Sequence, residues 1–263
     1  MGKLDGKEQE IIGKYLGGLS MPQLALIYGV AHQSIDKLLK KNKVQKRSKK
    51  ESLSIRFANY SKVSNELLEK INGWLLGDGS VYWRDSSQAS FEHGSKHFEY
   101  VEYIKNCFAK ENIKCNVRKI FSKKAKTYFW LLTTQRTIQF KELRDKWYPL
   151  GIKIIPQDLK ITPSVMKFWI MDDGSLDKID NILSLHTCAF KTEECHKLIE
   201  KIKYCFGEIK ASVILDGRQY SRININRLSY NKIIDIMNDI EVNCFQYKFN
   251  KKVCKKDRNI KEL

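Results

Sequence analysis

Two long blocks of the chain repeat the same order of hydrophobic and polar patterns. Each block opens with an apolar helical pattern, at residues 67–79 in the first block and 162–174 in the second. A β-rich stretch, an amphipathic helical pattern, a hairpin pattern and a last helix follow in both blocks. Because the whole order recurs, the sequence predicts two α/β half-domains related by a pseudo-two-fold axis.

Residues 7–41 carry a different pattern, which predicts three short helices. The first helix ends at Gly17-Gly18, Ser20 is a good N-cap for the second, and Gly29 suits a left-handed cap at its end. The third helix begins near His32. Their apolar positions should face a shared core: Ile11, Ile12, Tyr15 and Leu16 from the first helix, Leu24, Ala25 and Ile27 from the second, and Ile35, Leu38 and Leu39 from the third.

The last two of these helices resemble the helix-turn-helix of resolvase-like and regulator proteins. Small Ala25, turn Gly29 and inward Val30 stand at the positions that fix the interhelical angle. The sequence departs from that pattern at Ala31, where a hydroxyl N-cap is usual, and an ordinary helical hairpin is the alternative. The resemblance implies that the exposed start of the third helix contacts DNA through four residues: His32, Gln33, Ser34 and Lys37.

The charge balance points to a polyanionic partner. Lys and Arg number 48 against 30 Asp and Glu, a formal net charge of +18 with a pI near 9.5. Nucleic acid is the commonest partner of so basic a chain. Residues 40–56 hold eight basic residues against one acidic residue, which predicts a phosphate-binding linker that includes Lys46 and Arg47.

Composition excludes several other classes of protein. With 42% hydrophobic residues, the chain can bury a sizeable core. It shows neither an apolar run that could span a membrane nor a targeting signal at its start. The seven cysteines are irregularly spaced, which favours reduced thiols over a zinc cluster. We therefore expect no membrane association and an intracellular, reducing compartment.

Both leading helical patterns end at an aspartate followed by glycine. Residues 71–79, Ile-Asn-Gly-Trp-Leu-Leu-Gly-Asp-Gly, resemble the nonapeptide motif of the LAGLIDADG homing endonucleases. Residues 168–174, Phe-Trp-Ile-Met-Asp-Asp-Gly, resemble the second copy in the branch with a Trp-x-Met-Asp-Asp-Gly signature. The flanking segments Lys153-Ile-Ile-Pro156 and Tyr247-Lys248-Phe249 agree as well. The resemblance covers roughly residues 61–252.

The motif has a direct physical rationale. Gly73 and Gly77 remove two side chains from one helix face, so that a second helix can approach closely. Asp78 and Asp173 should then lie side by side, and two such carboxylates need cations to remain ionised. Oxygen ligands of this kind select Mg²⁺, for which Mn²⁺ should substitute, and the metal can activate water for phosphodiester cleavage. Gly77 and Asp172 are further candidates for the metal site, although neighbours on a helix diverge by about 100°, which favours Asp173 over Asp172 as the acid.

The resemblance also implies roles for residues outside the two motifs. Lys153 and Lys248 are expected beside the two cleavage points, where a buried cation could stabilise developing charge; ordinary surface lysines are the alternative. Glu92 and His186 match, loosely, the polar positions that order water in each half. A cross-strand partner for a lysine is the alternative role for Glu92.

The two hairpins should supply the grip on DNA, because antiparallel ribbons can enter a major groove. Basic residues crowd both of them: Arg118, Lys119, Lys123, Lys124 and Lys126 in the first, and Lys210, Arg218 and Arg222 in the second.

These features together predict an α+β protein with two pseudo-symmetric αββαββα half-domains preceded by a small all-α helix-turn-helix. The leading functional hypothesis is a monomeric, Mg²⁺-dependent, site-specific endonuclease that cuts double-stranded DNA. A non-catalytic helix-turn-helix regulator on the same scaffold and a maturase of intron RNA are the alternatives. The expected segments are a helix-turn-helix at 1–41, a basic linker at 42–60, half-domains at 61–150 and 151–252, and a basic tail at 253–263.

Overall fold

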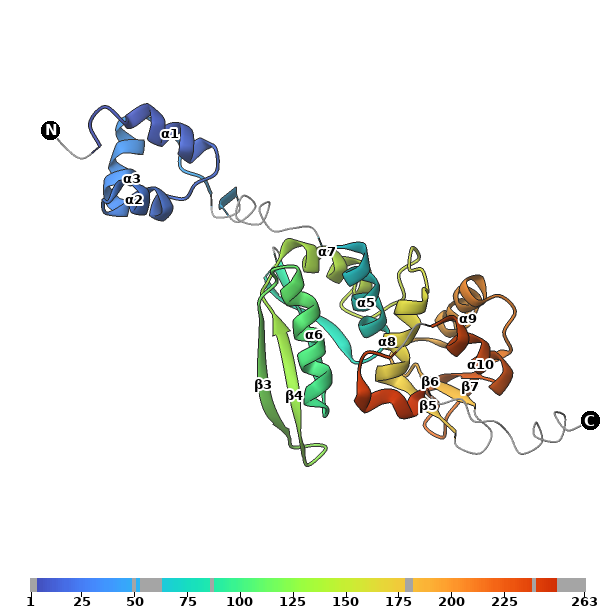
Figure 1. Ribbon diagram of the computed structural model, residues 1–263. Coiled ribbons are helices and arrows are strands. Elements are labelled where there is room, and N and C mark those ends of the chain that lie inside the picture. Colours follow the sequence, from blue (N-terminus) through green and yellow to red (C-terminus); the bar gives the residue numbers. More distant parts are fainter. Residues whose placement is uncertain are drawn as a thin grey trace, which may run out of the picture. The chain divides into compact units, whose positions relative to one another are not determined.

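The structure is a computed structural model that describes residues 4–48, 51–52, 63–85, 88–177, 182–237 and 240–249. The chain divides into two compact units, Met1–Ser61 and Lys62–Leu263, which are taken in turn (Figure 1). The end of the predicted linker and the predicted tail lie outside the described residues. None of the described helices is long and apolar enough to cross a membrane.

The first unit consists of three short helices whose ends follow the predicted caps. The Ser20 hydroxyl accepts the Gln23 N–H, while the Gln23 side chain accepts the Ser20 N–H at 2.9 Å. Gly29 ends the second helix in the left-handed conformation, with φ of 62°. The helices are α1 (Glu8–Leu16), α2 (Met21–Tyr28) and α3 (His32–Lys41).

The predicted core of this unit is confirmed except at two positions. Ile27 is 54% exposed and Leu16 is 68% exposed, although both were expected to face inward. The buried side of α2 carries Leu24 and Ala25. Ile27 follows Ala25 by two residues, a rotation of about 200° around the helix, so that its side chain points to solvent. The buried residues are Ile11, Tyr15, Leu24, Ala25, Ile35, Leu38 and Leu39.

The first unit also extends into the predicted linker. Val44 packs against the small core. The Arg47 guanidinium lies 4.1 Å from the centre of the Tyr15 ring and donates to backbone carbonyls of the α1–α2 turn. Lys46 pairs with Asp36 at 2.5 Å. After residue 42, where the linker was expected to begin, the chain instead folds back over α1. Both basic side chains are therefore engaged within the first unit.

The second unit contains two halves with the same order of elements, which confirms the predicted α+β class. The first half contains α5 (Asn65–Leu76), β1 (Gly79–Asp85), β2 (Gln88–Ser95), α6 (Phe98–Lys110), β3 (Cys115–Ser122), β4 (Thr127–Thr134) and α7 (Ile138–Trp147). The second contains α8 (Pro163–Asp173), β5 (Gly174–Leu176), β6 (Leu183–His186), α9 (Thr192–Phe206), β7 (Ala211–Leu215), β8 (Ser221–Ile225), α10 (Arg227–Ile236) and the 3₁₀ helix η1 (Asn243–Lys248).

Each half has one antiparallel sheet with the same strand order. The order is β1-β2-β4-β3 in the first sheet and β5-β6-β8-β7 in the second. Alternate side chains pack against helices, with α6 and α7 on the first sheet and α9 on the second (Figure 1). The opposite face of each sheet is open, and it carries polar residues together with apolar ones such as Leu131 and Ile214. Corresponding rows across the open faces are Ser80, Glu92, Thr133 and Asn116 in the first sheet, and Ser175, Ser184, Asn224 and Ser212 in the second.

Helices α5 and α8 pack together at the centre of the unit. A Cβ on Gly73 would lie 2.7 Å from the Val165 carbonyl oxygen and 2.8 Å from Phe168 Cβ. A Cβ on Gly77 would lie 2.3 Å from Asp172 Cβ. Each close approach thus joins a glycine of α5 to a larger residue of α8. Phe168, which stands where the motif has glycine, fits against Gly73 instead of weakening the interface.

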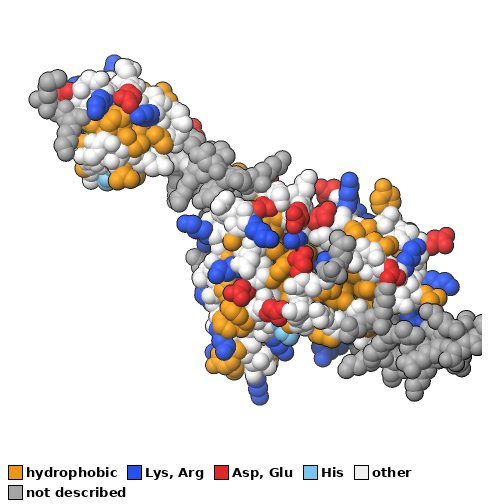
Figure 2. Space-filling model, in the orientation of Figure 1, with side chains coloured by type: hydrophobic (Ala, Val, Ile, Leu, Met, Phe, Trp, Pro, Cys, Tyr) orange, Lys and Arg blue, Asp and Glu red, His pale blue; other side chains and the backbone are white. Residues whose placement is uncertain are grey.

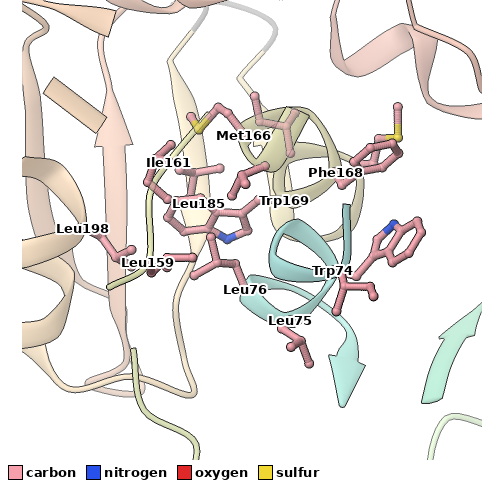
Figure 3. Packing of buried hydrophobic residues seen from close by; sticks show 14 of the residues in the cluster. Trp74, Leu75, Leu76, Leu159, Ile161, Met166, Phe168, Trp169, Leu185 and Leu198 are labelled. Atoms are coloured by element: carbon pink, nitrogen blue, oxygen red, sulfur yellow. The ribbon is translucent and has the colours of Figure 1, made fainter. Parts of the chain in front are cut away.

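Buried side chains from both helices form one continuous core (Figure 3). Trp74 lies beside Phe168, with ring centres 5.3 Å apart. Leu76 and Trp169 lie on the side of the second half, near Leu185 (Figure 3). Apolar burial on this scale holds the two halves as one unit.

We expect Gly73→Ala to destabilise this unit by about 1–3 kcal/mol, because the backbone of α8 would have to move to admit the methyl group. In an unstrained helix the same change stabilises by roughly 0.5–1 kcal/mol. All five tryptophans lie after residue 62, so their fluorescence during urea unfolding reports on this unit. The control is Gly217→Ala, whose Cβ would meet open space. A Gly73→Ala protein as stable as the control would disprove the close packing.

Candidate active site

The two predicted acids lie at the ends of the paired helices. Asp173 is the last residue of α8, and Asp78 comes two residues after the end of α5. Loss of water, then the charges of Asp78 and Asp172, raise the pKa of Asp173 to about 8. Asp78 is open to solvent on one side. Partial loss of water around its carboxyl group, followed by the charge of Asp172, nevertheless raises its pKa as well. The structure therefore brings together two carboxylates that resist carrying charge at the same time.

The neighbouring Asp172 has a different position. Its side chain is 1% exposed, and its Oδ2 atom accepts the Asp78 backbone N–H at 3.2 Å. The same oxygen lies 3.0 Å from Nε2 of His93, whose side chain is fully buried. Asp172 thus points into the helix interface, and its neighbour Asp173 diverges from it by about 100° around the helix. This carboxylate, one of those predicted for the metal, is engaged within the protein.

His93 is the residue of this site that sequence reasoning missed. It comes from β2 and lies against Tyr100, with ring centres 5.3 Å apart. Burial and then the charge of Asp172 hold the pKa of Tyr100 well above its usual range. A signal was present, because strand alternation places His93 on the face opposite Glu92, among apolar residues. A histidine buried there requires a polar partner.

The two predicted lysines occupy corresponding places in the two halves. Lys153 Nζ donates to the carbonyl oxygens of Gly77 and Gly79 at 3.2 and 3.1 Å. Lys248 Nζ donates to three carbonyl oxygens at the end of α8, those of Ile170 (3.2 Å), Met171 (2.6 Å) and Asp172 (3.2 Å). Each ammonium therefore satisfies carbonyl groups at a helix C-terminus, where positive charge is favoured. The Gly77 carbonyl, another predicted metal ligand, is one of these acceptors.

Neither lysine is an ordinary surface residue. Lys248 is 7% exposed, and Lys153 is half-buried. Burial lowers the pKa of Lys153 to about 8, against the opposing charges of the nearby acids. Burial lowers the pKa of Lys248 as well, again against the acids. One buried and one half-buried cation thus accompany the two acids.

Glu92 and His186 do not occupy equivalent positions. Glu92 accepts a hydrogen bond from the Thr133 hydroxyl at 3.3 Å, so that its hydrogen-bond partner on the next strand is a threonine rather than a lysine. Strand register pairs Glu92 with Ser80 and places Ser184 at the corresponding point of the second sheet. His186 lies one residue further along β6, with Nε2 3.1 Å from the Ser175 hydroxyl. Burial, and then the charge of Arg222, lowers the pKa of His186.

A groove of about 600 Å³ joins Asp78, at the end of α5, to the open face of the first sheet. Its lining includes Asp78, Glu92, Ser95, Tyr247 and Lys248. The open face therefore continues directly into the ends of the paired helices, and a bound polymer could reach both.

Strand alternation separates the basic residues of the first hairpin. Arg118 is exposed and shares the open face with Glu92, through its pairing with Leu131. Lys119 lies on the opposite face, with Nζ 5.0 Å from the centre of the Tyr128 ring. Figure 2 shows basic side chains projecting at the end of the unit where Figure 1 places the tip of this hairpin. The tip carries Lys123, Lys124 and Lys126.

The second hairpin places its basic residues at three different points. Arg222 lies on the open face beside His186 and forms an ion pair with Asp216 at 3.0 Å. Arg218 is in the turn, and Lys210 precedes the hairpin at its other end. On the face shown in Figure 2, basic and acidic side chains are interspersed rather than separated by sign.

The first unit places its predicted DNA contacts at the start of α3. His32, Gln33 and Lys37 are exposed there, and Ser34 is half-buried. Ala31 caps this helix without a side-chain hydrogen bond. The helix start is therefore open to an outside partner.

The donor set at the helix ends fits a divalent cation that keeps most of its water. In the described part of the chain, no group of three His, Cys, Asp or Glu side chains comes together around a metal position. Asp78 and Asp173 are two hard oxygen donors whose raised pKa values show the need for positive charge. Mg²⁺ is bound in this way, by one or two carboxylates with water and substrate phosphate as the remaining ligands.

We expect Mg²⁺ to bind the free protein more tightly as the pH rises from 6 to 8. Below about pH 8 Asp173 carries a proton, and the cation must displace it. One released proton corresponds to about tenfold in affinity for each pH unit. Calorimetric titration with Mg²⁺ at several pH values measures this dependence. Asp173→Asn should lower the affinity for Mg²⁺ and make it less dependent on pH. Equal affinity at pH 6 and pH 8 would contradict the assignment.

Comparison with known proteins gives one family and several relatives. The model of the LAGLIDADG DNA endonuclease family matches residues 68–233. The uncharacterized protein MJ1098 of Methanocaldococcus jannaschii is 29% identical over 196 residues, which are 72% of this chain and 75% of that protein. Cytochrome b mRNA maturase bI2 of Debaryomyces hansenii is 29% identical over 163 residues, 54% of this chain and 57% of that protein.

A solved structure has the same fold. The homing endonuclease I-WcaI bound to its DNA recognition sequence superposes with a TM-score of 0.67 at 22% identity. The match covers 81% of this chain and 99% of that one. The arrangement of two sheets around a central helix pair is therefore shared along nearly the whole length of that protein.

Proposed function

The chain belongs to the LAGLIDADG DNA endonuclease family, and on this basis we propose that it is a metal-dependent endonuclease that cuts both strands of DNA at a long, specific site. One observation carries the proposal. Asp78 and Asp173 come together at the ends of two packed helices, each end bound by a buried lysine. A protein that only bound DNA would gain nothing from two acids facing phosphates.

The residues divide the reaction between them. Asp78 and Asp173 would hold Mg²⁺ or Mn²⁺, which supplies activation of the attacking water and stabilisation of the leaving oxygen. Lys153 and Lys248 would stabilise the negative charge that develops on the phosphate. Each of the two helix ends has one acid and one lysine, so that each strand of a duplex can meet such a pair. Glu92, at the groove, would orient water on the side of the first half.

The open faces of the two sheets would bind the DNA. A strand advances about 3.3 Å for each residue, close to the rise of one base pair, so that alternate side chains can follow a groove. The polar groups best placed for bases and phosphates are the exposed Asn116 and Arg118 on β3, the exposed Ser212 on β7 and the half-buried Arg222 on β8. Both halves are present in one chain, which supports action as a monomer.

The first unit would add a second contact with DNA through the start of α3. The shape of this unit and its exposed His32, Gln33 and Lys37 support that role. Intron RNA is a second candidate partner, favoured by the likeness to the mRNA maturase over 54% of the chain. Direct binding to structured RNA would separate that role from cleavage.

We expect Asp78→Asn and Asp173→Asn each to abolish double-strand cleavage, because a neutral amide holds the cation far less well. Loss of about 10³-fold or more in rate is expected, while DNA binding should persist as repulsion of phosphate falls. Mg²⁺-dependent cleavage of a randomised DNA library, with sequencing of the ends, provides the target for these assays. The control is Asp158→Asn, which removes an exposed acid paired with Lys146. Near wild-type cutting by either site variant would remove that residue from the mechanism.

We expect deletion of residues 1–61 to leave the cleaved sequence unchanged and to make DNA binding less dependent on salt. The deleted segment holds the α3 contacts and the whole basic stretch of residues 40–56, whereas both acids and both lysines are retained. If about four phosphate contacts are lost, the slope of log affinity against log salt should flatten by about 3 units. The footprint should shorten on one flank only. An unchanged slope would mean that the first unit does not contact DNA.

A further inference from the structure

We propose that Glu99 and Glu194 are positioning residues, each of which holds the segment whose lysine binds the helix end of the opposite half. The proposal rests on the proposed function, because it concerns the placement of Lys153 and Lys248. It arises from two sets of contacts, one made by α6 of the first half and the other by α9 of the second. Neither glutamate touches the acids.

The segment that carries Lys248 crosses from the second half to α6 of the first. The Asn243 backbone N–H donates to Glu99 Oε1 at 2.9 Å. Two positions on, the Phe245 ring lies 4.8 Å from the Tyr100 ring, centre to centre. The next turn brings Lys248 to the end of α8.

Further contacts hold the same segment. The Tyr103 hydroxyl, also on α6, donates to the Glu241 carboxylate. Tyr230 of the second half donates to the Lys248 carbonyl at 2.8 Å. Side chains on both sides of Asn243, those of Glu241 and Phe245, are therefore held by the same helix of the first half as the Asn243 backbone. Lys248 itself is fixed at its carbonyl by its own half.

The segment that carries Lys153 is held from the second half in the same manner. The Ile155 backbone N–H donates to Glu194 Oε1 at 3.0 Å. Lys201, also on α9, donates to the carbonyls of Gln157 and Leu159, both at 2.8 Å. Glu194 and Glu99 both lie in the first turn of the corresponding helices α9 and α6, where the helix dipole favours a carboxylate.

These contacts matter because residues 151–162 have no helix or strand to fix them, and residues 240–249 have only one short 3₁₀ helix. A buried ammonium needs its backbone held in place, since the side chain alone can adopt many rotamers. Each lysine is therefore placed by a glutamate from the half opposite to the helix end that the lysine binds. The two halves must dock before either lysine can reach its carbonyls, so that the site assembles only in the complete unit.

The first experiment does not depend on cleavage. Glu99→Ala and Glu194→Ala are compared with Glu102→Ala and Glu193→Ala, which remove exposed acids of the same two helices. A small acetylating reagent, followed by mass spectrometry, measures the accessibility of each lysine. Glu99→Ala should raise the acetylation rate of Lys248 at least about fivefold and leave Lys153 unchanged, and Glu194→Ala should do the reverse. Equal change at both lysines, or change at neither, would overturn the proposal.

The second experiment measures cleavage of the selected target. Glu99→Ala should lower kcat by about 10- to 100-fold, the scale of a misplaced group, with KM for DNA within about twofold. Glu99→Gln should restore it, because the amide oxygen still accepts the Asn243 N–H. The same pair of changes is made at Glu194. Because Glu194 also accepts the Lys191 N–H at the start of α9, Glu194→Ala removes a helix cap as well as the contact with Ile155.

Double variants decide whether the glutamate acts through its lysine. Glu99→Ala should add no further loss to Lys248→Met, but should multiply the loss caused by Lys153→Met. Multiplication in both combinations would mean that Glu99 acts on overall structure and would refute the positioning role. A wild-type protein that cuts no DNA would refute the proposed function alone, and the acetylation result would still decide the placement of the lysines.

Discussion

The closeness of α5 and α8 determines the rest of the second unit. Gly73 and Gly77 give α8 access to the backbone of α5, and a Cβ at either position would fall within 3 Å of α8 atoms. That approach brings Asp78 and Asp173 to one end of the helix pair. It also places a sheet on each side of the same axis, so that both open faces meet at the acids. The spacing of two glycines thus sets the geometry of the site and of the surface proposed to hold DNA.

The same closeness makes the carboxylates of Asp78 and Asp173 repel each other. The two lysines reduce this repulsion without forming ion pairs with either acid. Lys153 and Lys248 bind carbonyl oxygens at the helix ends, and the ion pairs formed by the described residues include neither Asp78 nor Asp173. Their charges still oppose the rise in the pKa of Asp173. A direct salt bridge would have taken up the carboxylate oxygens that a cation needs. Carbonyl-bound lysines leave those oxygens free.

Sequence reasoning succeeded where local pattern decides structure. The caps at Ser20 and Gly29, the two helix-ending acids and the repeated order of elements depend on neighbours in the chain, and the structure follows them. It failed where register or tertiary contact decides. Ile27 faces outward because tertiary packing, which buries Leu24 and Ala25, decides how α2 is rotated about its own axis.

The same limit applied at the site. Nothing near Glu92 in the sequence shows that Thr133 is its partner, since strand pairing supplies that contact. The pair formed by His93 and Asp172 joins residues from different halves. No local pattern contains such a pair, although the alternation along β2 indicated that His93 points inward. Lys46 and Arg47 also looked like free phosphate contacts, because the ring and the acid that engage them are distant in the chain.

The two halves are fused in one chain, and the helix interface uses that freedom. In a symmetric dimer, residues on the two-fold axis meet their own copies. Here Gly73 meets Phe168, and Gly77 meets Asp172, which occupy matching places in the two motifs. Two phenylalanines would not fit at the first crossing, and two buried aspartates would repel at the second. A single chain can instead place glycine on one side and a larger residue on the other. Asp172 thereby gains the space to bind His93 and the Asp78 backbone, so that the second half orients the acid of the first.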